Sequence, residues 1–166
     1  MITRKAGAAL AAGCAVVLKP AEDTPLTALA IAQLASEEAK LRAGLFSVLT
    51  VPRGPGGSEE IGDLLCQHPA IRLLGFTGST AVGELLYRKA AATGNRVLLE
   101  LGGNAPFIVF NSADVDKAVS GAVASKFRCS GQMCVSANRI LVESDICDEF
   151  VNKLVSAVSA LTLGDG

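Results

Sequence analysis

Residues 71–101, IRLLGFTGSTAVGELLYRKAAATGNRVLLEL, contain the pattern that decides the fold class. We expect a strand over residues 71–78, a helix over 79–91 and a second strand over 95–101. Both strands are apolar along most of their length rather than at every second position, which is typical of buried strands in a parallel sheet. This stretch therefore predicts a strand–helix–strand unit of an α/β protein.

Helices and strands alternate on both sides of this unit. Further strands are expected at residues 14–20, 45–51, 106–110 and 139–143, and further helices at residues 3–12, 59–67, 114–127 and 145–161. Another helix is expected to have Thr24 as its N-cap and Pro25 in its first turn, and to end before Gly44. One side of it carries Leu26, Leu29, Ala30 and Leu34. The order predicts an α/β fold with a doubly wound, mostly parallel sheet that helices cover on both faces.

The composition favours a folded protein that acts on a small molecule or on another protein. Of the 166 residues, 50% are hydrophobic, which supports a substantial core and argues against disorder. The formal net charge is -1, so no charged surface for nucleic acid or for a membrane is expected. His68 is the only histidine and no C-x-x-C pair is present, which argues against a metal site and against a Ser-His or Cys-His pair. We interpret His68 as a solvated loop residue.

Five cysteines occur, at positions 14, 66, 129, 134 and 147, and this odd number fits a reducing compartment better than a disulfide framework. Cys14, Cys66, Cys129 and Cys147 are interpreted as small packing residues. Cys134 is expected in a turn between a helix and a strand, where backbone amides can stabilise a thiolate. The alternative for Cys134 is that it is also a buried, small hydrophobic residue.

Ligands of a doubly wound sheet bind at the carboxyl ends of its strands, so the residues after each strand are candidates for function. The candidates are residues 19–22, residues 75–83, Glu100 and the cysteine loop before Asn138. Residues 75–83, GFTGSTAVG, join a strand to a helix through small residues, which leaves backbone N–H groups for a phosphate. They lack the G-x-G-x-x-G spacing, and a helix cap without a ligand is an equally good interpretation.

Lys19, Glu22 and Glu100 are charged residues at predicted strand ends. Lys19 and Glu22 could hold ribose hydroxyls, or could form an ordinary surface turn. Glu100 ends an apolar strand, and we expect its carboxyl group to be partly buried with a raised pKa, which suits a general base. The alternative for Glu100 is an exposed acid at the end of a strand.

Four motifs follow one another along the chain: KPAEDTPL at 19–26, GFTGSTAVG at 75–83, LELGGNAPFIVF at 99–110 and GQMCVSANR at 131–139. With these motifs the chain resembles the aldehyde dehydrogenase superfamily over essentially its whole length. Three further segments resemble the succinate-semialdehyde dehydrogenase branch: MITRKAGAALAAGC at 1–14, NSADVDKAVSGAVASKFR at 111–128 and DEFVNKL at 148–154.

The resemblance implies two domains and a chain that is truncated at both ends. Residues 1–101 correspond to part of a Rossmann-like, NAD-binding domain, and residues 102–166 to the N-terminal part of an α/β catalytic domain. The family's oxyanion-hole asparagine would precede Met1, and the oligomer-forming strands would follow Gly166. The full-length enzyme is expected to be an intracellular homo-oligomer, mitochondrial in a eukaryote and cytoplasmic otherwise.

The resemblance also implies a role for residues in each motif. Cys134 corresponds to the nucleophile and Glu100 to the general base. Arg4 and Arg128 correspond to arginines that hold the distal carboxylate of succinate semialdehyde. The implied cofactor-binding residues are Lys19, Pro20, Ala21, Glu22, Gly78, Ser79, Thr80, Ala81, Val82 and Gly83. No residue is assigned to a metal.

The implied reaction is the oxidation of succinate semialdehyde to succinate, as in GABA catabolism, through a cysteine thioester. The carboxylate of Glu22 would repel a 2′-phosphate, which favours NAD over NADP. The alternatives are another aldehyde dehydrogenase with a different substrate, and a catalytically incomplete fragment that binds a nucleotide.

Overall fold

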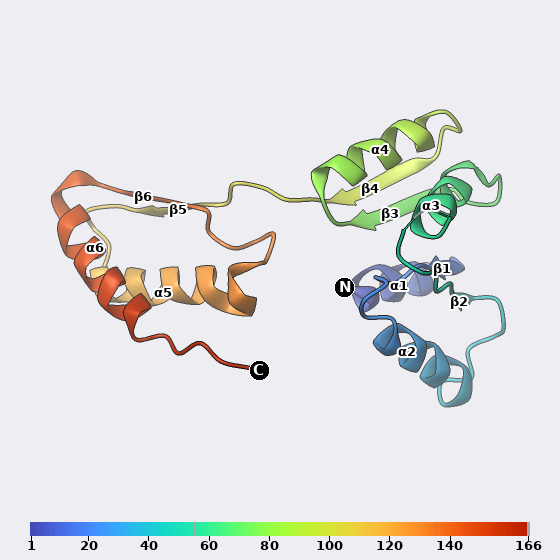
Figure 1. Cartoon of the computed structure of the whole chain (residues 1–166), viewed down its shortest axis with the longest axis horizontal. Coiled ribbons are helices and arrows are strands. Elements are labelled where there is room, and N and C mark those ends of the chain that lie inside the picture. Colours follow the sequence, from blue (N-terminus) through green and yellow to red (C-terminus); the bar gives the residue numbers. More distant parts are fainter. Residues whose placement is uncertain (55, 166) are drawn as a thin grey trace. The chain divides into compact units, whose positions relative to one another are not determined.

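The computed structural model describes residues 1–54 and 56–165 (Figure 1). Helices and strands alternate along the chain, which confirms the α/β class that the sequence predicts. The elements are α1 (Ile2–Ala11), β1 (Val16–Leu18), α2 (Leu26–Glu37), β2 (Phe46–Val48), α3 (Ser58–Gln67), β3 (Leu73–Thr77), α4 (Thr80–Ala91), β4 (Arg96–Glu100), β5 (Pro106–Val109), α5 (Val115–Phe127), the short 3₁₀-helix η1 (Arg128–Gly131), β6 (Arg139–Val142) and α6 (Ser144–Ser159).

Contacts between residues divide the chain into two compact units. Unit 1 comprises Met1–Thr77 and Ala81–Glu100, and unit 2 comprises Gly78–Thr80 and Leu101–Gly166. In unit 1, β1 pairs with β2 and β3 pairs with β4; in unit 2, β5 pairs with β6. All three pairs are parallel, as predicted, but the described strands form three separate pairs rather than one sheet. β1 and β2 have three residues each, so few of their backbone N–H and C=O groups could pair with a further strand.

One core of unit 1 lies between the β3–β4 pair and the helices α3 and α4. Its buried residues are Cys66 of α3, Leu74 of β3 and Ala90 of α4, and Leu65, Leu86 and Val97 pack against them. Apolar residues from two helices and two strands meet here, as the strand–helix–strand pattern of the sequence predicts. This core packs the C-terminal half of α4, with Leu86 and Ala90, against β3 and β4.

The cysteines differ in exposure. Cys66 is fully buried, which confirms its packing role, and burial raises the pKa of its thiol. Cys147 of α6 is partly buried. Cys14 lies in the connection between α1 and β1, and Cys129 lies in η1, and both are exposed. The predicted packing role is therefore wrong for Cys14 and Cys129, because both lie in connections outside the packed faces.

The core of unit 2 lies between the β5–β6 pair and the helices α5 and α6 (Figure 1). Its buried residues are Val109, Val119, Ala122 and Phe150. Side chains alternate between the two faces of a strand, so Ile108 and Leu141, which pair in register, point away from this core and are exposed. Helices therefore cover one face of this pair, in contrast to the expected cover on both faces.

Helix α2 differs from its prediction in its first residues and in its buried side. The helix begins at Leu26 with Pro25 at the N-cap position, and no side chain caps it, so the predicted cap by Thr24 is wrong. Ala28 is its buried residue, whereas the predicted apolar side is exposed at Leu26, Leu29, Ala30 and Leu34.

The turn after α5 is left-handed at three consecutive residues. The dihedral angle φ is 50° at Cys129, 57° at Ser130 and 72° at Gly131. This conformation costs roughly 1–2 kcal/mol for a residue with a side chain, whereas glycine adopts it freely. Gly131 also packs against the end of α5, since a Cβ atom there would lie 3.3 Å from the carbonyl oxygen of Lys126. A strained turn therefore lies just before Cys134, separated from it by Gln132 and Met133.

We predict that Cys129→Asn stabilises the protein. Asparagine adopts left-handed conformations more readily than cysteine, so the free energy of unfolding should rise by about 0.5–1 kcal/mol. Urea denaturation measures the difference. Cys14→Asn is the matched control, because Cys14 is also exposed but is not left-handed. An equal gain in both variants would contradict the role of the backbone conformation.

Candidate active site

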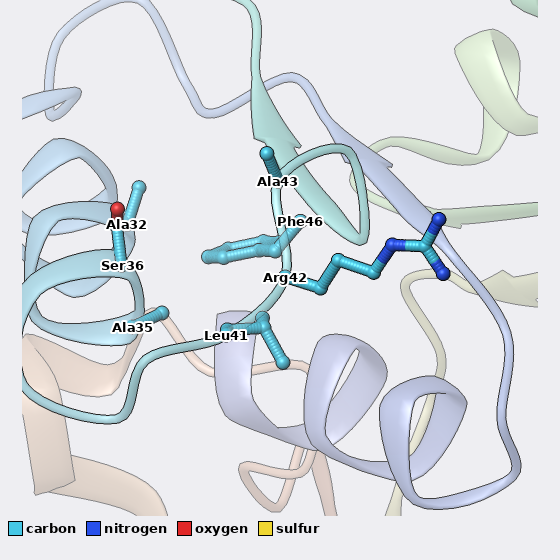
Figure 2. A pocket seen from close by; sticks show the side chains of 7 residues that line it. All are labelled: Ala32, Ala35, Ser36, Leu41, Arg42, Ala43 and Phe46. Carbon is cyan, nitrogen blue, oxygen red and sulfur yellow. The ribbon is translucent and has the colours of Figure 1, made fainter.

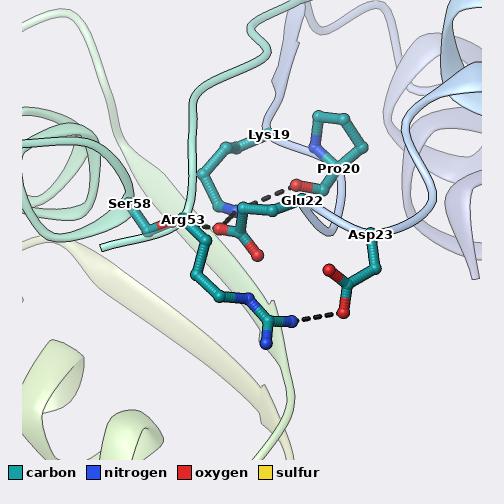
Figure 3. Close-up of polar contacts among 6 residues, drawn as sticks. All are labelled: Lys19, Pro20, Glu22, Asp23, Arg53 and Ser58. Atoms are coloured by element: carbon teal, nitrogen blue, oxygen red, sulfur yellow. Dashed lines mark hydrogen bonds and ion pairs between the residues drawn. The ribbon is translucent and has the colours of Figure 1, made fainter.

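Lys19, Glu22 and Ser58 form a polar cluster beyond the carboxyl end of β1 (Figure 3). Lys19 Nζ donates hydrogen bonds to Glu22 Oε1 at 2.7 Å and to the carbonyl oxygen of Pro20 at 2.9 Å. Ser58, the first residue of α3, donates a hydrogen bond from Oγ to the same carboxylate oxygen. The two residues predicted to hold a ribose therefore lie together. Within the predicted segment between them, Pro20 is buried and Ala21 is exposed.

Glu22 is held in its ionised form. The hydrogen bond from Lys19 is the largest cause that lowers the pKa of Glu22 from its ordinary value of 4.5 to about 2, and the hydrogen bond from Ser58 is the second. A second ion pair, between Asp23 and Arg53, joins the same two loops at the surface (Figure 3). The Glu22 side chain keeps an exposed fraction of 20%, so its negative charge is accessible to a ligand.

Residues 78–83 form the junction between β3 and α4. β3 ends at Thr77 and α4 begins at Thr80, so Gly78 and Ser79 make the connection. Gly83 is buried, and the exposed residues of the junction are Gly78, Ser79, Thr80, Ala81 and Val82. Small, exposed residues at the N-terminus of a helix are typical of anion-binding sites. Phosphate binding at this junction stays a prediction.

Glu100 is the last residue of β4 and pairs with Thr77 at the end of β3. Its side chain is exposed, so the expected partial burial is wrong. The alternation along β4 explains the difference, because Val97 packs into the core and Glu100 points to the opposite face. Leu98 on that opposite face is itself 52% exposed.

Cys134 presents an exposed, free thiol in the loop between η1 and β6, so the interpretation as a buried packing residue is wrong. Two backbone hydrogen bonds between residues three positions apart lie in this loop. Gln132 N donates to Cys129 O at 3.2 Å, and Ser136 N donates to Met133 O at 3.0 Å. The loop precedes β6, so it lies at the amino ends of the β5–β6 pair, and the predicted position at the carboxyl ends of strands is wrong.

Arg4 and Arg128, the predicted substrate-binding arginines, are both exposed. Arg128 is the first residue of η1, so it shares a loop with Cys134 in unit 2. Arg4 lies on α1 in unit 1. A joint carboxylate site of the two arginines therefore stays a prediction.

Sequence reasoning missed Ser58, Lys126 and Asn138, whose side chains contact the predicted segments. Asn138 accepts a hydrogen bond from Lys126 Nζ at 3.0 Å and donates one to the carbonyl oxygen of Gly103 at 2.8 Å. The position of Ser58 at a helix start after a glycine-rich loop is a usable sequence signal. Asn138 lies in the GQMCVSANR motif, but neither it nor Lys126 gives a local signal for their contact, because the contact joins residues that are 12 positions apart.

A small cavity of unit 1 lies between α2 and β2 (Figure 2). It has a volume of about 80 Å³ and is lined by Ala32, Ala35, Ser36, Leu41, Arg42, Ala43 and Phe46. Phe46 is the first residue of β2, so the cavity lies near the amino end of that strand, away from the carboxyl end that Lys19 and Glu22 follow in β1. Small-molecule sites usually hold roughly 300–1,000 Å³, so this cavity is too small for a dinucleotide.

Residues 1–54 and 56–165 contain no group of three or more histidine, cysteine or carboxylate side chains that could hold a metal ion. Within the same residues, every helix is too short or too polar to cross a membrane. His68 is exposed, and its Nδ1 accepts a hydrogen bond from the backbone of Ala70 at 3.2 Å, which confirms its interpretation as a loop residue.

Comparisons with known proteins agree with the motifs. The sequence model of the aldehyde dehydrogenase family matches residues 1–166. The chain is 55% identical over 166 residues to the 3-sulfolactaldehyde dehydrogenase of Pseudomonas putida and 55% identical over 166 residues to the NADP(+) succinate-semialdehyde dehydrogenase of Escherichia coli. Each alignment covers 100% of this chain and 33% of the relative.

A crystal structure of succinate-semialdehyde dehydrogenase from Burkholderia pseudomallei is similar with a TM-score of 0.91 and 52% identity, over 99% of this chain and 33% of that chain. The chain thus spans about a third of the length of the curated relatives that it matches. Because the family model matches along the whole chain and the motifs around Glu22, Glu100 and Cys134 lie within that match, the protein belongs to the aldehyde dehydrogenase family.

Proposed function

We propose that this chain carries the nucleophile and part of the cofactor site of an NAD-dependent enzyme that oxidises succinate semialdehyde to succinate. The observation that carries the proposal is the exposed, free thiol of Cys134 within the GQMC motif, in a loop that contains two local backbone hydrogen bonds. Family membership supports the reaction class. The proposal covers the activity of the whole enzyme, of which the chain corresponds to about a third by its relatives.

The chain supplies the nucleophile and the general base of the proposed reaction. The thiolate of Cys134 attacks the aldehyde carbon and forms a tetrahedral hemithioacetal. NAD, held by Lys19, Glu22 and residues 78–83, would supply the hydride acceptor for this oxidation, and loss of the hydride would leave a thioester on Cys134. Glu100 takes a proton from the water that hydrolyses the thioester, so succinate leaves and the thiol is restored. The exposed position of Glu100 leaves its carboxylate open to water.

The charge of Glu22 supports NAD as the cofactor. Lys19 and Ser58 keep this carboxylate ionised, and a second negative group such as a 2′-phosphate would be repelled there. The small residues at 78–83 suit the pyrophosphate of either cofactor. The Escherichia coli relative is named for NADP(+). The proposal of NAD for this chain therefore depends on Glu22 and not on that relative.

The position of Arg128 supports an aldehyde with an acidic group at its far end. A guanidinium group binds a carboxylate with two parallel hydrogen bonds, and Arg128 stands exposed in the same loop as Cys134. The names of the two relatives, for succinate semialdehyde and 3-sulfolactaldehyde, both denote aldehydes with an anionic group. The residues of the described loop favour this class of substrate over uncharged aldehydes.

We predict that Cys134→Ala abolishes the formation of NADH from succinate semialdehyde and NAD, because the thioester cannot form without the thiol. Absorbance of NADH measures the rate. Cys14→Ala, at another exposed cysteine, should leave the rate unchanged. Binding of NAD without any turnover in the unsubstituted protein would contradict the enzyme proposal and support the alternative of a nucleotide-binding fragment.

We predict that Arg128→Ala lowers kcat/KM for succinate semialdehyde by roughly 10- to 100-fold, the usual contribution of a charged hydrogen-bonded pair. The value for an uncharged aldehyde such as butyraldehyde should change little. Arg88→Ala is the control, because Arg88 is an exposed arginine of α4 that pairs with Glu84 at 3.4 Å. Equal losses for both aldehydes would contradict the carboxylate-binding role.

We predict that Glu22→Gln raises the ratio of kcat/KM for NADP to that for NAD by about 10-fold, because it removes a like charge from the ribose site. Steady-state kinetics with both cofactors measure the ratio. Glu37→Gln, at an exposed carboxylate of α2, is the control. An unchanged ratio in Glu22→Gln would show that Glu22 does not select the cofactor.

The same variant tests whether Glu22 is ionised in the folded protein. Its pKa is lowered to about 2, so its charge stabilises the fold fully above about pH 4.5, and this stabilisation is lost as the pH falls toward 2. Urea denaturation measures the free energy of unfolding at pH 7 and at pH 3. Between these two pH values it should fall less in Glu22→Gln than in the unsubstituted protein. Equal losses would contradict the lowered pKa.

A further inference from the structure

Asn138 lies at the centre of a hydrogen-bond network within unit 2. Its side-chain Nδ2 donates to the carbonyl oxygen of Gly103 at 2.8 Å, and its Oδ1 accepts from Lys126 Nζ at 3.0 Å. Its backbone N–H donates to the carbonyl oxygen of Ala105 at 3.0 Å. Asn138 therefore makes two hydrogen bonds to residues 102–105, which we call the glycine segment, and one to the last turn of α5.

Lys126 determines which way the amide of Asn138 points. An ammonium group can only donate hydrogen bonds, so the amide oxygen must face Lys126. The amide nitrogen then faces the carbonyl oxygen of Gly103, which can only accept. The reversed amide would place two donors together on one side and two acceptors together on the other. Only one orientation of the Asn138 amide therefore allows both side-chain hydrogen bonds.

The three bound segments are neighbours in sequence of the proposed reacting and substrate-binding groups. Gly103 follows Glu100 by three residues, Asn138 follows Cys134 by four, and Lys126 precedes Arg128 by two. The carbonyl oxygen of Lys126 also lies 3.3 Å from where a Cβ atom of Gly131 would be. The end of α5 therefore contacts both the network and the strained turn that precedes Cys134.

We propose that Asn138 is a positioning residue that ties the glycine segment after Glu100 to the loop of Cys134, and that Lys126 fixes the orientation of its amide. This inference rests on the proposed function, because it assigns the network to the placement of the nucleophile loop. The network anchors the chain on the C-terminal side of Cys134 to the end of α5, so it restricts the positions that the thiol can adopt. Loss of the network should therefore lower the reactivity of Cys134.

Two variants break different bonds of the network. Asn138→Asp keeps the acceptor for Lys126 but replaces the donor to Gly103 by an oxygen that repels the carbonyl. Lys126→Met keeps Asn138 and removes the group that orients it, and it serves if Asn138→Asp does not fold. Lys126→Arg retains a donor and should behave as the unsubstituted protein. Lys117→Met is the matched control, since Lys117 lies on the same helix and pairs only with Asp114 at 3.4 Å among the ion pairs of the described residues.

The first measurement is the rate of alkylation of Cys134 by iodoacetamide, divided by the rate at Cys14 in the same molecule. Mass spectrometry separates the two sites, and Cys14 is an exposed internal reference. The ratio should fall at least about threefold in Asn138→Asp and Lys126→Met, as expected for the loss of one hydrogen bond. It should be unchanged in Lys126→Arg and Lys117→Met. An unchanged ratio in both network variants overturns the proposal, as does an equal fall in Lys117→Met.

The second measurement is the turnover of succinate semialdehyde with NAD. A displaced nucleophile should lower kcat about 10-fold in Asn138→Asp and Lys126→Met and leave KM within about twofold, because neither residue binds the substrate. A network that only stabilises the fold would lower the unfolding temperature with kcat unchanged per folded molecule, and this result overturns the proposal. If the unsubstituted protein shows no turnover, the proposed function fails, and the alkylation ratio alone decides the role of Asn138.

Discussion

Parallel pairing of strands that follow one another in the chain is the constraint on which the rest of the structure depends. A parallel return needs a crossover, so α4 connects β3 to β4 and α5 connects β5 to β6. The carboxyl ends of paired strands then open to the same edge, and Thr77 stands beside Glu100 for this reason. In the same way, the residues after β1 meet those that follow β2, where Lys19, Glu22 and Ser58 form their cluster.

In unit 2 the candidate residues lie at the amino ends of the paired strands, not at the carboxyl ends. The loop of Cys134 and the glycine segment after Glu100 both lead into strands, so they meet at the amino ends of β5 and β6. Strand pairing begins only at Pro106 and Arg139, and Asn138 extends the contact toward Gly103 with its side chain. The left-handed turn at Cys129, Ser130 and Gly131 lets the chain leave α5 and reach this edge within a few residues.

Sequence reasoning recovered what depends on local pattern and missed what depends on distant neighbours. Apolar strands and helix periodicity predicted the six described α-helices, the six described strands and the parallel pairing, but not the 3₁₀-helix η1, and the motifs identified the family. The exposure of Glu100 was missed because a residue's burial depends on which face the helices cover, and Val97 rather than Glu100 faces them. The left-handed conformation of Cys129 was missed because cysteine gives no signal for it. The roles of Lys126 and Asn138 depend on a contact between segments that no local pattern records.

The central claim is that Cys134 is the nucleophile that forms a thioester with the substrate. The most direct test is acid quenching of the protein during reaction with succinate semialdehyde and NAD, followed by fragmentation mass spectrometry of the cysteine-containing peptides. The account predicts a succinyl group on Cys134 and none on Cys129, although both thiols are exposed in the same loop. Formation of NADH with the succinyl group on another cysteine, or with no acylated cysteine at all, would contradict the account.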